Sequence, residues 1–234
     1  MISVLLAAYC GEKYIAEQIA SILPQLEDGD ELLVSDDSPE GHTATRDIVL
    51  GFQDERIRYV QGPRRGVIKN FEFLLGQAKG DILVLSDQDD VWLPDKLKCA
   101  RNMLSQRYPA LLAYGAVLTD ENLRETGEIQ SVTPGIWRNL LKNSYTGCCM
   151  AFTRELLPYI LPFPEGIPMH DQWIALRAEQ LMRKNQEGIV YPVAIPFILH
   201  RRHEGAQTGR GGTLAQKLRW RWNMLRALRA TPRR

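Results

Sequence analysis

Asp87, Asp89 and Asp90 place three carboxylates within four consecutive residues of this 234-residue chain, shortly after the apolar run 82–85. An apolar run of this length predicts a strand that is buried on both faces. Like charges so close together repel one another, and a divalent cation between them relieves the repulsion. Because carboxylate oxygens on a short turn suit Mg²⁺ or Mn²⁺, the pattern predicts a metal site beyond the carboxyl end of a strand. A solvated acidic turn is the alternative interpretation.

Two more predicted strands end in polar residues. The apolar run 2–9 ends at Tyr9, before a turn, and the run 31–35 ends at Asp36 and Asp37. Helical patterns alternate with these runs, which predicts βαβ units and a parallel sheet. Right-handed crossovers bring the carboxyl ends of parallel strands to one edge of the sheet. We therefore expect the three polar strand ends to meet at one site.

The rest of the chain continues as a mixture of helices and strands. We expect helices at residues 15–23, 43–52, 67–78, 95–106, 136–143, 155–161 and 171–184, and further strands at 57–60, 111–118, 145–152 and 190–199. Prolines within the last of these strands predict an edge position. Residues 119–133 are polar and irregular. We predict one α/β domain over residues 1–212 and a C-terminal helical extension over 213–234.

The composition is that of an ordinary globular protein, with 44% hydrophobic and 24% charged residues. No apolar run approaches the roughly 20 residues that span a bilayer. The first residues enter a strand-like run without a basic region, so we expect no signal peptide. Four irregularly spaced cysteines are too few for a disulfide scaffold or a zinc site. These features predict a reducing compartment, the cytoplasm.

The net charge of +1 conceals an acidic body and a basic tail. Residues 201–234 contain ten Lys and Arg against one acidic residue, whereas residues 1–200 contain 27 acidic and 19 basic residues. Apolar residues in the tail recur at helical spacing, at Leu214, Leu218, Trp222, Leu225 and Leu228. A basic amphipathic helix of this kind is typical of a peripheral contact with the inner face of the membrane. Packing of the stripe on the body or on a second subunit is the alternative, and we expect no nucleic-acid binding because the body is acidic.

Several segments, in this order and spacing, resemble family 2 glycosyltransferases of the GT-A fold, most of all the bacterial rhamnosyltransferase-like members that build cell-surface polysaccharides. The segments are Ala8-Tyr9-Cys10-Gly11, Ser35-Asp36-Asp37-Ser38, Asp87-Gln88-Asp89-Asp90-Val91-Trp92 with Pro94, Thr146-Gly147-Cys148 and Met169-His170-Asp171. The resemblance implies a Rossmann-like, mostly parallel central sheet flanked by helices. It also implies inverting, metal-dependent sugar transfer from a nucleoside-diphosphate sugar (dTDP-rhamnose or a UDP-sugar) to a hydroxyl of a glycan or lipid-linked acceptor.

The resemblance also implies roles for individual residues. Asp37, with Asp36, accepts a hydrogen bond from N3–H of uracil or thymine, and Asp171 is the catalytic base. Asp89 binds Mg²⁺ or Mn²⁺, and His203 completes the metal shell. The remaining nucleotide-binding residues are expected at Ala7, Ala8, Tyr9, Glu12, Asn70 and Asp87, and donor or acceptor contacts at Trp92, Gly147, His170 and Arg202.

Alternatives remain for several of these residues. Asp171 precedes an apolar helix and is also explained as a first-turn acid. His170 stands where the family often has an acid, and it is also explained as a metal ligand or a structural histidine. The segment 200–203 and the Gly-rich loop 205–212 suit a diphosphate clamp or a basic surface turn. For the whole chain, a catalytically silent nucleotide-binding scaffold or a sugar nucleotidyltransferase is the alternative to a glycosyltransferase.

Overall fold

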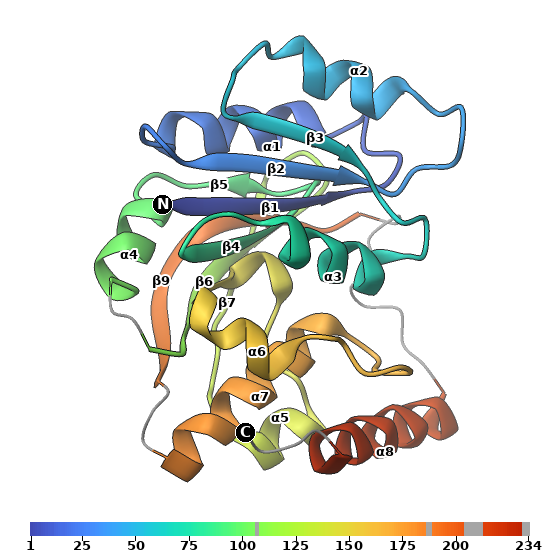
Figure 1. Cartoon of the computed structure of the whole chain (residues 1–234), viewed down its shortest axis with the longest axis vertical. Helices are drawn as coiled ribbons and strands as arrows, with labels where there is room; N and C mark the ends of the chain where they lie inside the picture. Colours follow the sequence, from blue (N-terminus) through green and yellow to red (C-terminus); the bar gives the residue numbers. More distant parts are fainter. Residues whose placement is uncertain (106–107, 186–188, 204–212, 231–234) are drawn as a thin grey trace.

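A nine-stranded sheet forms the centre of the protein, in the order β3-β2-β1-β4-β8-β6-β9-β5, with β7 paired to β6 (Figure 1). The computed structural model describes residues 1–105, 108–185, 189–203 and 213–230. The first half of the sheet is parallel and contains β1 (Ile2–Ala8), β2 (Glu31–Asp36), β3 (Ile57–Gln61) and β4 (Ile82–Asp87). This half confirms the predicted Rossmann-like arrangement.

The second half of the sheet is mixed. It contains β5 (Val91–Trp92), β6 (Ala110–Thr119), β7 (Glu125–Gln130), β8 (Met150–Thr153) and β9 (Ile189–Arg201). Strand β8 runs antiparallel to both β4 and β6, whereas β9 runs parallel to β6. Strand β5 pairs with β9 and β7 pairs with β6, both antiparallel.

Helices cover both faces of the sheet, and each face has its own hydrophobic core. One core lies under α1 (Ile15–Ile22), α2 (Ala44–Gly51) and α4 (Lys96–Met103). The other lies under α3 (Val67–Gln77), α5 (Ile136–Leu141), α6 (Leu157–Ile160), α7 (His170–Asn185) and α8 (Leu214–Ala230). Three short 3-10 turns complete the elements: η1 (Leu23–Gln25), η2 (Gly147–Cys149) and η3 (Arg154–Leu156). Within the described ranges, no helix is long and apolar enough to span a bilayer.

The structure corrects the predicted elements in three places. Strand β7 lies within the segment 119–133, which was expected to be irregular; five of its six residues are exposed, so no alternation marked it as a strand. The predicted strand 145–152 is instead η2 followed by β8. Strand β9 is an edge only in part, because β5 pairs with its residues Ile198 and Leu199. The predicted loop 205–212 lies outside the described residues.

Candidate active site

The carboxyl ends of β1, β2 and β4 lie side by side, as the sequence predicts. Ala8 is the register partner of Asp36 on β2, and Ala7 is the partner of Asp87 on β4. All three strands are almost completely buried, because each is covered by helices on both faces. The polar residues that follow them therefore emerge together at one edge of the sheet.

The two aspartates after β2 organise the loops around that edge. Asp36 is buried, and its carboxylate accepts hydrogen bonds from Ser38 N at 3.0 Å and from the Tyr59 hydroxyl at 3.0 Å. Burial beside this carboxylate raises the pKa of Tyr59 to about 12. Asp37 accepts from Arg64 N at 2.5 Å and from Gly66 N at 2.8 Å, which fixes the basic loop against the strand ends. Each carboxylate oxygen has a second lone pair, so Asp37 can still accept a hydrogen bond from a ligand.

The turn after β1 is held by two side chains from other segments. The Gln88 side-chain amide pairs with the Tyr9 peptide, accepting from Tyr9 N at 2.8 Å and donating to Tyr9 O at 3.1 Å. The Tyr9 side chain is 59% exposed. Glu12 is exposed and accepts from the Thr45 hydroxyl at 3.2 Å. A backbone hydrogen bond and the neighbouring His42 lower the pKa of Glu12.

Asn70, from α3, lies directly beneath the strand ends. It is buried, its Nδ2 donates to Ser35 O at 3.0 Å, and its Oδ1 accepts from the Ser35 hydroxyl at 2.5 Å. A Cβ on Gly62 would lie 3.0 Å from Asn70 Oδ1 and 2.7 Å from Asp37 Oδ1, so only glycine fits there. These contacts give Asn70 a positioning role at the predicted nucleotide site.

The three carboxylates after β4 differ in their partners. Asp87 has no hydrogen bond to its side chain within the described ranges, and burial, then the charges of Asp89 and Asp90, raise its pKa to about 8. Asp89 Oδ2 lies 2.9 Å from His203 Nε2, and the pKa of Asp89 is raised by burial and by Asp90. These two carboxylates are only partly buried.

Asp90 is fully buried and is neutralised by the chain itself. Its Oδ1 lies 2.9 Å from His200 Nδ1 and accepts from Arg201 N at 3.1 Å. Burial alone would raise the pKa of Asp90, but the hydrogen bond and charge of His200, together with hydrogen bonds from Cys148 and Arg201 N, outweigh it and the pKa is lowered. Burial lowers the pKa of His200, yet the Asp90 carboxylate outweighs this effect and raises it to about 9. His200 and Asp90 therefore form a buried ion pair.

A buried lysine, which no sequence pattern singled out, lies behind the acidic turn. Lys96 is fully buried, its Nζ donates to Cys148 O at 2.8 Å, and it lies 3.7 Å from the centre of the Trp92 ring. Burial lowers the pKa of Lys96 to about 8. Trp92 itself is 3% exposed. This position favours a supporting role for Trp92, in place of the substrate contact expected from the sequence.

Asp171 is the second residue of α7, the last helix of the α/β body, and is 3% exposed. Burial raises the pKa of Asp171 to about 7. The turn η2 connects Asp171 to the acidic turn after β4, because Gly147 approaches Asp171 and Cys148 Sγ lies within 4.8 Å of an Asp90 carboxylate oxygen. A Cβ on Gly147 would lie 3.9 Å from Asp171 Cβ and 2.9 Å from His170 Nε2. The close approach of η2 to the start of α7 thus requires a glycine.

His170 is a neutral imidazole with a free nitrogen. Its ring stacks on Phe71 at a centroid distance of 4.1 Å, and burial lowers its pKa to about 3. His170 Nε2 is buried and has no hydrogen-bond partner among the described residues. Arg202, by contrast, is exposed, and its backbone N–H donates to Thr119 O at 2.9 Å.

Two donor sets are suited to a cation. Asp89 and His203 offer an oxygen and a nitrogen at a partly exposed position, beside the uncompensated Asp87 carboxylate. This set suits a hard divalent ion such as Mg²⁺ or Mn²⁺. Asp90, Cys148 and His200 also lie within 4.8 Å of one another, but all three are buried and Asp90 is already paired with His200. The first set is therefore the better fit for the predicted metal.

Two curated relatives of the chain are named as glycosyltransferases. The chain is 29% identical over 166 residues to the UDP-Glc:alpha-D-GlcNAc-diphosphoundecaprenol beta-1,3-glucosyltransferase WfgD of Escherichia coli, covering 70% of this chain and 64% of WfgD. It is 28% identical over 155 residues to the putative teichuronic acid biosynthesis glycosyltransferase TuaG of Bacillus subtilis, covering 63% of this chain and 60% of TuaG. The chain thus spans less than two thirds of the length of either relative.

Solved structures share the fold. S. aureus TarS 1-349 in complex with UDP-GlcNAc superposes with a TM-score of 0.67 at 20% identity, over 90% of this chain and 61% of TarS. Glucosyl-3-phosphoglycerate synthase from Mycobacterium tuberculosis, in complex with Mn²⁺, UDP and phosphoglyceric acid, gives a TM-score of 0.60 at 22% identity, over 97% and 77%. The family described as glycosyl transferase family 2 matches residues 3–160. The chain therefore belongs to glycosyl transferase family 2.

Proposed function

We propose that the chain transfers a sugar from a uridine- or thymidine-diphosphate donor to a hydroxyl of a glycan or lipid-linked acceptor during cell-surface glycan synthesis. The observation that carries this proposal is the buried Asp171 carboxylate, which η2 connects to the acidic turn after β4, because Gly147 approaches Asp171 and Cys148 approaches Asp90. WfgD is named for a UDP-Glc donor and a diphosphoundecaprenol acceptor, and TuaG for teichuronic acid synthesis, which supports this class of reaction. We place the catalytic unit in residues 1–212 and the reaction in the cytoplasm.

Recognition of the base is assigned to the carboxylate after β2. A pyrimidine imide presents an N–H donor, which is suited to a carboxylate that only accepts hydrogen bonds. Asp37 is fixed by backbone donors from Arg64 and Gly66, so its position is set before a ligand arrives. Its remaining lone pairs make Asp37 the preferred partner, with Asp36 holding the loop behind it.

Stabilisation of the leaving group is assigned to Asp89 and His203, which would hold Mg²⁺ or Mn²⁺. When bound there, a divalent ion acts as a Lewis acid for the diphosphate that carries the developing negative charge. Burial, and then the negative charge of the neighbouring carboxylates, raise the pKa values of Asp87 and Asp89, so negative charge is crowded at this position. That crowding is the observation in this chain that favours a cation.

Activation of the acceptor is assigned to Asp171. As the acceptor oxygen attacks the anomeric carbon, the bond from that carbon to the diphosphate oxygen breaks, and Asp171 takes the hydroxyl proton. A single displacement of this kind inverts the anomeric centre. A base with a pKa of about 7 is well matched to proton transfer near neutral pH. The free His170 Nε2 beside Asp171 supports a contact with a sugar hydroxyl.

The test combines binding with turnover. Calorimetry with UDP, dTDP and GDP, each with and without Mn²⁺, should give metal-dependent binding of a pyrimidine nucleotide and little binding of GDP. UDP-glucose and dTDP-rhamnose then serve as two arms of a donor screen that follows nucleotide release. Tight GDP binding, or binding unaffected by Mn²⁺, would contradict the proposal. Nucleotide binding without turnover of any donor in a broad panel would favour the silent scaffold instead.

A further inference from the structure

A second chemically distinctive surface is formed by α5 and α8, at the end of the molecule opposite α2 (Figure 1). The two helices are in direct contact, and the Arg221 guanidinium of α8 donates to Leu141 O of α5 at 2.7 Å. Both helices expose apolar and basic residues together. We call this surface the basic aromatic face and define it by Trp137, Leu141, Leu214, Leu218 and Trp222 with the Lys and Arg residues of α8.

Helix α8 has one apolar side that packs on the body and another that does not. Met224, Ala227 and Leu228 are buried in the core under α7. Leu214, Leu218 and Trp222 are 73%, 56% and 63% exposed, and their spacing of four residues places them on one side of the helix. The stripe seen in the sequence therefore divides, because only its C-terminal part packs on the body. Exposure of three large apolar side chains in a row is unfavourable in water and indicates a partner.

Helix α5 repeats the same chemistry. Trp137 and Leu141 are 62% and 63% exposed, and they lie one turn apart. Arg138 and Lys142, the residues that follow each of them, are also exposed. Two helices that are distant in the sequence thus present tryptophan, leucine and cationic side chains next to one another. A single exposed residue would need no explanation, but this repetition does.

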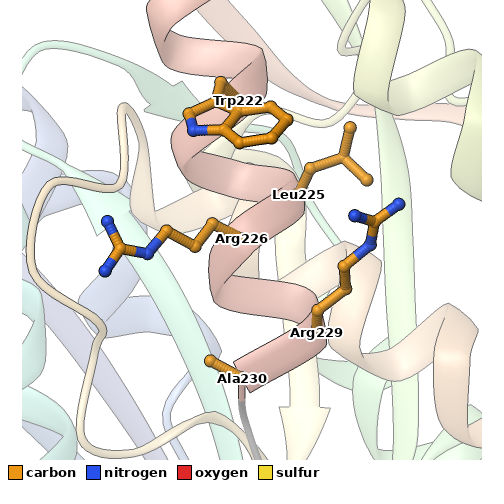
Figure 2. Close-up of a pocket in the computed structure, with 5 residues that line it drawn as sticks. All are labelled: Trp222, Leu225, Arg226, Arg229 and Ala230. Carbon is orange, nitrogen blue, oxygen red and sulfur yellow. The ribbon is translucent and has the colours of Figure 1, made fainter.

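The charge of the basic aromatic face has one sign only. Helix α8 contains five basic residues and helix α5 contains one, and neither helix contains an acidic residue. A pocket on α8 is lined by Trp222, Leu225, Arg226, Arg229 and Ala230, and Arg226 and Arg229 extend from opposite sides of the helix (Figure 2). Apolar side chains flanked by guanidinium groups suit a lipid phosphate above its acyl chains.

We propose that the basic aromatic face binds the surface of a membrane rich in anionic phospholipids. Tryptophan and leucine enter the boundary between headgroups and acyl chains, while Lys and Arg contact the lipid phosphates. A second copy of the chain is a poorer occupant, because the same cationic surface would face itself. The inference does not depend on the proposed sugar transfer, although it places the enzyme where a lipid-linked acceptor is found.

The test is vesicle sedimentation with the full chain, followed by tryptophan fluorescence. Vesicles of phosphatidylcholine are compared with vesicles that contain about one third phosphatidylglycerol. We expect binding to the anionic vesicles, a blue shift of the tryptophan emission, and weakening of binding as salt is raised. No sugar nucleotide or metal is present, so failure of this test would leave the proposed sugar transfer unaffected.

Two variants separate the contribution of the apolar side chains to vesicle binding from that of the charged side chains, and each has a matched control on α2. Leu218→Ser/Trp222→Ser should weaken vesicle binding at least tenfold, whereas Leu50→Ser, which alters an exposed leucine at the other end of the molecule, should not. Binding to anionic vesicles should weaken about 100-fold in the triple variant Arg219→Gln/Arg226→Gln/Arg229→Gln, because each charge near an anionic surface contributes about fivefold. Arg46→Gln is the control for charge.

Each outcome decides the proposal. Selective binding to anionic vesicles that both face variants lose supports it. Absence of vesicle binding overturns it, as does equal binding of the face variants and the controls. Analytical ultracentrifugation covers the remaining case: a dimer that Leu218→Ser/Trp222→Ser dissociates, without vesicle binding, would assign the face to a second copy.

Discussion

Replacement of Asp171 by asparagine should make the protein more stable while it removes the catalytic base. Burial raises the pKa of this carboxyl from 3.8 to about 7, so folding favours its protonated form. Between these two values the folded state binds more protons than the unfolded state, and stability falls as the pH rises. Above pH 7 the full cost of burying the charge applies, which is about 4 kcal/mol for a shift of this size.

The asparagine side chain avoids that cost at every pH. It has almost the same shape, and its oxygen can still accept the hydrogen bond that Asp171 Oδ1 accepts from Gln172 N at 2.5 Å. At pH 5 most of the penalty is absent in the wild-type protein, because the buried carboxyl is protonated. The stabilisation by Asp171→Asn should therefore be about 2 to 3 kcal/mol larger at pH 8 than at pH 5.

Urea unfolding of both proteins at pH 5 and pH 8, followed by tryptophan fluorescence, measures this difference. Taking the variant against the wild type at each pH cancels the titrating groups that do not interact with Asp171. Asp28→Asn, at an exposed turn, is the matched control and should show no comparable pH dependence. Turnover of the Asp171 variant should fall at least about 100-fold, the usual contribution of a general base. Equal stabilisation at both pH values would refute the account of burial, and retained turnover would refute the role as base.

Three further changes test other parts of the site. Asp89→Ala should remove the Mn²⁺ dependence of UDP binding in calorimetry, and metal dependence that persists would contradict the assignment of the ligand. In Gly147→Ala the new Cβ would lie 2.9 Å from His170 Nε2. This change should lower the free energy of unfolding by about 1 to 3 kcal/mol, measured by urea unfolding, and it should also lower kcat. Comparison of the wild type with Lys96→Met should show a pH dependence of stability that is opposite in sign to the one for Asp171→Asn. Because burial lowers the Lys96 pKa from 10.5 to about 8, the stability of the wild type relative to this variant should rise by about 3 kcal/mol between pH 7 and pH 10, and a flat difference would refute it.

The parallel half of the sheet was predictable because its sequence signals are local. The runs that became β1, β2 and β4 are mainly apolar, each is followed by or ends at polar residues, and helical patterns separate them. Burial on both faces makes such runs continuous, which distinguishes them from exposed strands. The meeting of their carboxyl ends then follows from the handedness of the crossovers.

The remaining elements depend on pairing across long distances in the sequence. Strand β7 is almost entirely exposed and is defined by its hydrogen bonds to β6, so its own residues show no strand pattern. Strand β5 has two residues and exists because β9 runs beside it. Lys96 is the clearest failure of prediction, since lysine is almost never fully buried and only the folded chain brings it onto the Trp92 ring.

The charges around the acidic turn explain why a cation is expected at Asp89 and not at Asp90. Asp90 is neutralised by His200, which approaches from β9, and its pKa is lowered. Lys96 contributes a further positive charge from the buried side, where it is held by Cys148 O. These groups leave Asp87 and Asp89 with raised pKa values, even though His203 lies 2.9 Å from Asp89, and both carboxylates are only partly buried. At this turn the described residues thus balance the buried carboxylate, Asp90, and leave the excess of negative charge at the partly exposed carboxylates, Asp87 and Asp89.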